Sequence, residues 1–184
     1  MINKLARMAK AKVLIVLFIA TLPFLGFFTY RETALQDLTH ECSPTLDPNL
    51  FYTSEDAYKL FGKLEQRGRD LYAWTAITVD MVFPIIYSFF LSLLTIYIYQ
   101  RCLIKKSPHF LPILPFIAML FDYGENVLIA FMLFNYPQKH TALASIASLF
   151  TKLKLGLLII SYLAIFIGLA CLMIQSDSKR EQTS

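Results

Sequence analysis

Four long apolar stretches constrain this chain more than any other feature of its sequence. The first covers residues 13–30 and has no charged side chain; the others cover about 71–100, 110–134 and 146–175. A helix needs about 20 mostly apolar residues to cross a bilayer, and hydrocarbon does not tolerate unpaired backbone groups. The pattern therefore predicts an all-α polytopic membrane protein, a four-transmembrane-helix bundle that forms one domain over residues 1–184.

Composition agrees with this class and excludes others. Hydrophobic residues make up 57% of the chain and charged residues 16%, whereas soluble domains average about 45–50% and about 25%. A disordered chain, a collagen-like chain and a highly charged nucleic-acid binder are excluded. The basic residues before the first stretch are typical of a signal peptide, but no A-x-A cleavage site follows, which favours an uncleaved anchor. Membrane lipids are the expected partners, and the oligomeric state is left open.

The basic residues predict the orientation. Nine Lys and Arg residues lie before residue 13, between 101 and 109, and after 175, whereas the 31–70 connection has five basic and eight acidic residues. Positive charge favours the cytoplasmic side. Both termini are therefore predicted to be cytoplasmic and residues 31–70 to lie outside, in a bacterial inner membrane or a plasma-type membrane.

The outer connection is predicted to carry a short amphipathic helix. Residues 54–67 begin with capping and acidic residues and continue with an apolar stripe, so we expect them to lie on the outer leaflet. Arg67 and Arg69 follow at the level of lipid phosphates. They either contact lipid headgroups or bind an anionic substrate through their guanidinium groups.

Two acidic residues must lie within the membrane. Asp122 and Glu125 are preceded by only twelve uncharged residues and followed by thirteen, so neither flank can span alone. Their spacing places them on one helix face together with Asn126, and that face must point into the bundle. Gly124 beside them leaves room for a neighbouring helix.

A third acid is expected to join them. Asp80 lies about two helical turns inside the second stretch, at a depth similar to that of Glu125, and Tyr87 is a suitable hydrogen-bond partner. Pro84 would free the carbonyl group of Asp80 and kink this helix. Lys152 and Lys154 can reach the outer surface instead, because residues 155–175 can span without them. Lys154, which lies deeper than Lys152, is also the only cation within a span near the acidic residues.

The acidic cluster has three interpretations. In the first, the cluster is structural: it fixes the register of the helices or lines a cavity for a hydrophobic small molecule. In the second, it performs acid–base catalysis on a lipid or isoprenoid, with Asp80, Asp122 and Glu125 as the candidate groups. In the third, it relays protons in a small transporter. No nucleophile motif or phosphate loop accompanies it, so whether the protein is an enzyme is left open.

The sequence predicts no metal site, cofactor or disulfide. Cys42, Cys102 and Cys171 fall at different places in the predicted topology, and no Cys/His metal-binding spacing occurs.

Several short motifs resemble those of a set of uncharacterised, mostly bacterial four-helix membrane proteins. These are F-Y-T-S-E-D-A-Y at 51–58, G-R-x-x-Y at 68–72, D-x-x-F-P-x-x-Y at 80–87 and D-x-x-E-N at 122–126. The resemblance covers about residues 50–160. It implies a membrane location and a four-helix fold, and it implies no activity.

Overall fold

Every regular element in the described part of the chain is a helix. The computed structural model describes the backbone of residues 2–39, 45–46, 52–102 and 110–181, and the side chains of 4–39, 45–46, 52–102 and 110–175. The elements are α1 (Ile2–Met8), α2 (Ala11–Thr39), α3 (Ser54–Lys63), α4 (Gln66–Ile77), α5 (Val79–Tyr99), a 3-10 turn η1 (Leu111–Ile113), α6 (Leu114–Phe134) and α7 (Thr141–Glu181).

Four segments of the described chain are long and apolar enough to cross a membrane. They are Ala11–Thr39, Gln66–Tyr99, Leu111–Phe134 and Thr141–Gln175. This confirms the predicted four-helix membrane bundle. The observed limits differ most from the predicted ones in the first segment, which continues to Thr39 rather than ending near residue 30. That extension brings a basic residue, Arg31, into the bundle.

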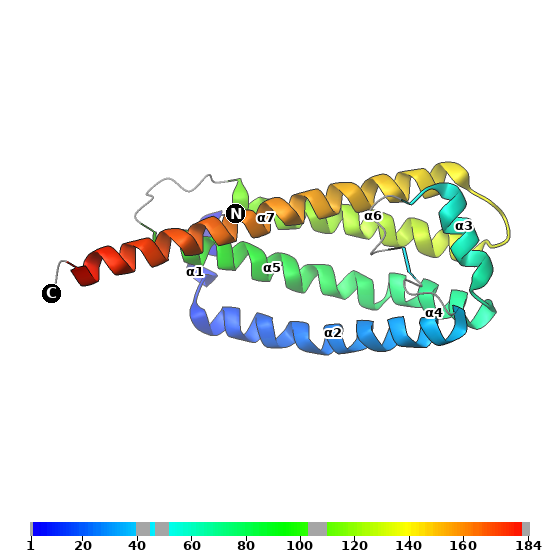
Figure 1. The fold of residues 1–184 in the computed structure, drawn as a ribbon, viewed down its shortest axis with the longest axis horizontal. Coiled ribbons are helices and arrows are strands. Elements are labelled where there is room, and N and C mark those ends of the chain that lie inside the picture. Colours follow the sequence, from blue (N-terminus) through cyan, green and yellow to red (C-terminus); the bar gives the residue numbers. More distant parts are fainter. Residues whose placement is uncertain (1, 40–44, 47–51, 103–109, 182–184) are drawn as a thin grey trace.

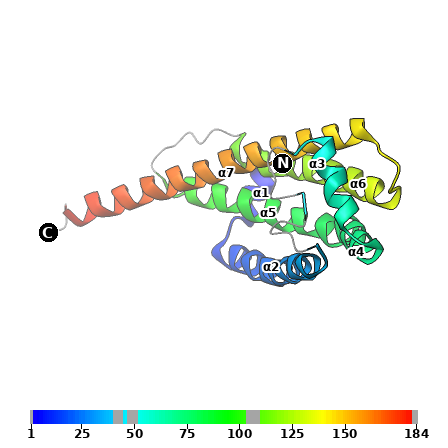
Figure 2. The same ribbon diagram turned by 45° about the vertical axis from the view of Figure 1, so that its right-hand side comes forward.

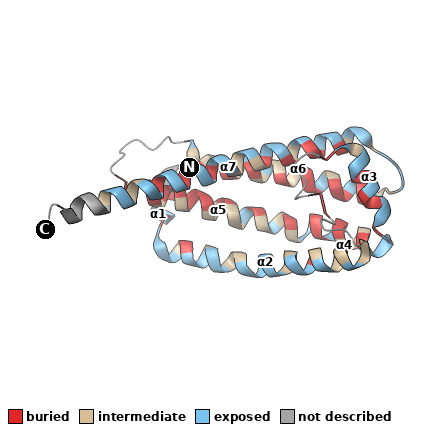
Figure 3. Cartoon of the chain, viewed as in Figure 1, coloured by how far each residue is buried: buried red, intermediate tan, exposed pale blue. Residues whose placement is uncertain are grey.

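The long helices run lengthwise side by side, with α6 packed between α7 and α5, and α2 packed on α5 (Figure 1). Both termini lie toward the same end of the bundle, and α3 and α4 lie at the opposite end. The last turns of α7 project beyond the other helices, as Figure 2 also shows. Buried positions gather on α5, α6 and the inner side of α7, whereas α2 buries only Leu14, Arg31 and Leu35 (Figure 3). Helix α2 is therefore the most peripheral of the four.

The second span is broken where its polar residues begin. Helix α4 ends at Ile77 and α5 starts at Val79, with Thr78 between them at φ −121° and ψ −80°. Pro84 lies inside α5, and the carbonyl oxygen of Asp80, which Pro84 leaves without its helical donor, accepts a hydrogen bond from Asn126 Nδ2 at 3.3 Å. The proline thus frees a backbone acceptor that the neighbouring helix α6 satisfies.

The amphipathic helix of the outer connection is confirmed, but it is shorter and more buried than predicted. It ends at Lys63, and a separate helix, α4, begins at Gln66. A capping box starts α3: the backbone N–H and hydroxyl of Thr53 donate to the Asp56 carboxylate, and Thr53 Oγ1 accepts from the Asp56 N–H. These bonds, the backbone one first, lower the pKa of Asp56 below its ordinary value of 3.8. The ionised carboxylate therefore stabilises the start of α3.

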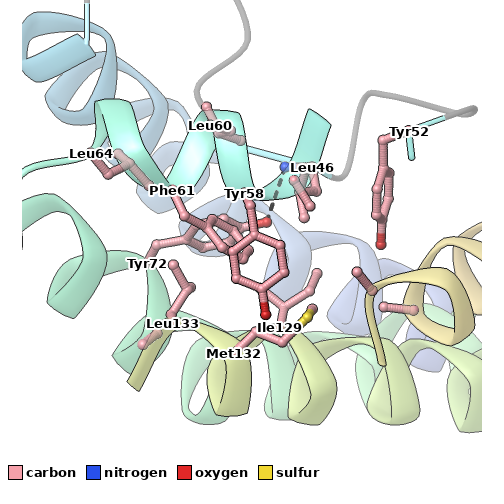
Figure 4. Packing of buried hydrophobic residues seen from close by; sticks show 14 of the residues in the cluster. Leu46, Tyr52, Tyr58, Leu60, Phe61, Leu64, Tyr72, Ile129, Met132 and Leu133 are labelled. Carbon is pink, nitrogen blue, oxygen red and sulfur yellow. Dashed lines mark hydrogen bonds between the residues drawn. The ribbon is translucent and has the colours of Figure 1, made fainter. Parts of the chain in front are cut away.

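The apolar face of α3 covers the end of the bundle rather than lipid. Tyr58, Leu60 and Phe61 are buried in one hydrophobic cluster that also contains Ile129, Met132 and Leu133 of α6 (Figure 4). The hydroxyl group of Tyr72 in this cluster accepts a hydrogen bond from the backbone N–H of Leu46 at 3.0 Å. A segment that was expected to rest on the membrane surface instead closes one end of the hydrophobic core.

Helices α5 and α7 approach closely at Gly168. A Cβ atom at this position would lie 2.6 Å from Ile98 Cγ2 and 3.2 Å from the Tyr99 ring. The Tyr99 hydroxyl donates to the carbonyl oxygen of Ala164 at 3.0 Å, and the Cys102 thiol donates to that of Gly168 at 3.3 Å. The small pair Ala164 and Gly168 therefore packs within the bundle.

We expect Gly168→Ala to destabilise the protein by about 1–3 kcal/mol because of overpacking, although alanine favours a helix over glycine by about 1 kcal/mol. Gly156→Ala on the same helix is the matched control, because a Cβ there meets nothing within 4 Å. Thermal unfolding in detergent measures both. If Gly168→Ala melts no lower than the control, the close approach is not a constraint on packing.

Candidate functional site

The site begins with an ion pair between α2 and α5. Arg31 is 4% exposed, and its Nη1 donates to Asp80 Oδ2 at 2.9 Å. Its Nη2 donates to Glu32 Oε1 at 3.1 Å, and the Thr45 hydroxyl donates to the same oxygen at 2.9 Å. The guanidinium group thus holds the peripheral helix α2 against the start of α5.

A second group of contacts joins α5 to α6 around Asp122. The Tyr87 hydroxyl donates to Asp122 Oδ2 at 3.0 Å, and Asn126 Nδ2 donates to Asp122 Oδ1 at 3.3 Å. Asn126 also donates to the carbonyl oxygen of Asp80. The one amide group therefore connects the two acidic residues, and four residues named from the sequence meet here as predicted.

Lys154 of α7 completes the network, and the expectation that it reaches the outer surface is wrong. Its side chain is 10% exposed, and Nζ lies 3.1 Å from Asp122 Oδ1 and 2.6 Å from Glu125 Oε2. The Thr151 hydroxyl donates to Glu125 Oε1 at 2.6 Å. Glu125 itself is fully buried. Lys152, two residues away, is exposed as expected.

The position of α7 explains why Lys154 stays inside. Helix α7 begins at Thr141, so Lys154 lies thirteen residues, about 20 Å, along its axis. The small buried residues Ala144, Ala147 and Ser148 let the first turns of α7 pack on the bundle. At that depth the lysine lies beside two carboxylates. Ion pairs with them compensate its charge, so the side chain does not need to extend to water.

We call Arg31, Asp80, Asp122, Glu125 and Lys154 the ion network. Each of the four membrane-spanning segments contributes to it, and within the described residues these are the buried ionisable groups of the spans. Charges in a bilayer are stable only when they are paired and hydrogen-bonded. The network therefore links all four segments at one level.

A cavity of about 360 Å³ lies beside the ion network. Its polar lining comes from Arg31, Asp80, Tyr87, Asp122, Asn126 and Lys154. Its apolar lining comes from Phe28 of α2, Phe83 and Pro84 of α5, and Leu155, Leu158 and Tyr162 of α7. The lining residues thus come from α2, α5, α6 and α7. The space is thus apolar along its sides and charged at its base.

Arg67 and Arg69 are not part of this site. Arg69 Nη1 donates to the carbonyl oxygens of Phe61, at 3.2 Å, and Leu64, and its guanidinium carbon lies 4.4 Å from the centre of the Tyr136 ring. Arg69 therefore ties the junction of α3 and α4 to the end of α6. Arg67 is exposed on α4.

The described residues contain no group of three or more His, Cys, Asp and Glu side chains arranged to hold a metal ion. Cys102 and Cys171 are free thiols, and Cys42 lies outside the described residues.

The sequence does not indicate that Arg31 belongs to this site, because the apolar run stops at Tyr30 and Arg31 then falls in the predicted outer connection. The sequence does hold one indication that the first helix continues past residue 30, because residues 31–39 contain no Gly or Pro. For Lys154 the signal was its spacing from Thr151, which puts both polar groups on one face of α7.

No protein-family model matches this chain, and comparisons with curated proteins and with solved structures found no match. The resemblance to mostly bacterial four-helix membrane proteins therefore stays a prediction that rests on its motifs.

We expect Lys154→Met to destabilise the protein by about 3–5 kcal/mol, because it leaves Asp122 and Glu125 buried without their shared cation. Adding Glu125→Gln should recover part of this loss, since one uncompensated charge is removed. Lys152→Met is the control and should destabilise the protein much less, because exposed ion pairs contribute only about 0–1 kcal/mol. Thermal unfolding in detergent measures all three. Equal effects of the two lysine variants would contradict the buried pairing.

Proposed function

We propose that the protein binds a hydrophobic small molecule or lipid within the membrane, in the cavity beside the ion network. The cavity is the observation that carries this proposal. Its volume of about 360 Å³ falls in the range of about 300–1,000 Å³ that small-molecule sites occupy. Apolar walls with a few converging polar groups are also typical of such sites.

The walls support entry from the bilayer. Tyr162 is 48% exposed on the outside of α7, and Phe28 and Phe83 are half-buried on α2 and α5. Helix α2 packs mainly on α5, while α7 packs mainly on α6 and α5. A ligand moving between α2 and α7 would reach the cavity without crossing the polar ends of the bundle.

The ion network supports a role in orienting the ligand. Its charged groups are gathered at the base of the cavity, so a polar head would lie there and an apolar chain would lie along Phe83, Leu155 and Leu158. A purely structural network would need no space beside it. Turnover of the bound molecule would make the protein a lipid-acting or isoprenoid-acting enzyme, and pH-driven uptake would make it a transporter; both are outcomes of experiments on the same site.

We propose the orientation that the basic residues favour, with both termini cytoplasmic and the connection that carries α3 outside, in a bacterial inner or plasma-type membrane. In a cysteine-free background, we expect Glu55→Cys to react with a membrane-impermeant maleimide in intact cells. Lys10→Cys should react only after the membrane is opened. The reverse pattern would overturn this orientation.

Filling the cavity should abolish binding without unfolding the protein. We expect Leu158→Trp to reduce labelling by a long-chain alkyl diazirine photoprobe in lipid nanodiscs to background, because the indole ring occupies the space of the chain. The labelled peptides are identified by mass spectrometry, and those of the wild type should come from α5 and α7.

Leu163→Trp is the matched control, because Leu163 lies on the same helix, is 55% exposed and does not line the cavity. Equal labelling of the two variants, at equal melting temperature, would contradict binding in this cavity.

A further inference from the structure

The charges that meet at the base of the cavity do not balance. Among the described residues, two basic groups, those of Arg31 and Lys154, contact four carboxyl groups: Glu32, Asp80, Asp122 and Glu125. Glu32 is the most exposed of the four, with 28% of its side chain accessible. Even without it, three buried acids face two buried bases. The group therefore has one more buried carboxyl than buried basic groups, and either a proton or the cation of a ligand can balance it.

The basic groups do not turn their charge toward a ligand. Lys154 Nζ lies within 3.1 Å of Asp122 and Glu125, and Arg31 donates to Asp80 and Glu32. An anionic head would have to compete with these carboxylates for the same donors. A cationic head would instead add the positive charge that the group lacks, at a place where low polarity strengthens ion pairing.

Aromatic rings provide an independent reason to expect a cation. Phe28, Phe83, Tyr87 and Tyr162 all line the cavity. Phe83 packs edge-on against Phe28, with ring centres 5.1 Å apart, and against Tyr87, with ring centres 5.5 Å apart. The guanidinium carbon of Arg31 already lies 5.2 Å from the centre of the Phe28 ring. Rings gathered beside carboxylates favour alkylammonium groups, since cations are attracted to their faces.

We propose that the cavity selects amphiphiles that carry a positively charged amine, with the ammonium group near Asp80 and Asp122 and the chain along α7. This inference rests on the proposed function, because it names the class of ligand for the same cavity. Tyr87 and Phe83 would contact the alkyl groups of the ammonium. Glu125, which is buried behind Lys154, contributes through the charge balance rather than by contact.

Three probes of one chain length test the inference with the unaltered protein. They are dodecyltrimethylammonium, its uncharged carbon isostere with a tert-butyl end, and dodecanoate, with the two charged probes used below their micelle concentrations. Each competes with the long-chain diazirine photoprobe in nanodiscs of uncharged lipid. We expect the ammonium probe to compete at least about tenfold more strongly than the isostere, given the strength of desolvated cation–π contacts, and dodecanoate to be the weakest.

The variant Glu125→Gln tests the cause of the selectivity. It leaves two buried acids for two buried bases, and Glu125 does not line the cavity. We expect the ratio of competition by the ammonium probe to competition by the isostere to fall to about one. Glu55→Gln, which removes an exposed charge on α3, is the matched control and should keep the full preference.

The outcomes separate the two proposals. If none of the probes competes and the photoprobe labels no cavity residue, the proposed function fails. If the isostere or dodecanoate competes as well as the ammonium probe, the cavity binds hydrophobic molecules but the selection of amines is overturned. If Glu125→Gln does not fold, the comparison of the three probes on the unaltered protein still decides the selectivity.

Discussion

The pairing of buried charges is the constraint on which the rest of this structure depends. In the part of the chain that the structure describes, five charged side chains lie buried inside the bundle, and an unpaired charge there would cost far more than any single packing contact supplies. Each membrane-spanning segment holds at least one of the five, so satisfying them sets the relative depth of all four segments. Arg31 in particular holds α2, which otherwise buries little of its surface.

The other elements adapt to this network. The break at Thr78 and the proline at position 84 leave the carbonyl group of Asp80 available to Asn126. Helices α3 and α4 close one end of the bundle with a buried apolar cluster. Gly168 lets the distant part of α7 lie close to α5, so that the same helix carries both Lys154 and the wall of the cavity. A polar base beside an apolar space is the combination that makes this cavity suited to an amphiphile.

Much of the site was predictable because the membrane restricts where acids can go. Asp122 and Glu125 had no route to either surface, so their inward position followed from counting residues, and their spacing brought Asn126 onto the same face. The same counting failed for the basic residues. Residues 155–175 are long enough to span alone, so nothing in that count held Lys154 inside. Arg31 was assigned to a connection because hydropathy ends there, although the helix does not.

The sequence by itself determined the class of protein, the number of spans and the inward position of the central acids. These follow from local properties, namely the length of each apolar run and the cost of an ionised group in hydrocarbon. Only the tertiary structure decided which cations compensate the acids, that α3 covers the core rather than the lipid surface, and that a cavity lies between α2 and α7. These features depend on the axial register between neighbouring helices. That register is set jointly by side chains that lie far apart in the sequence.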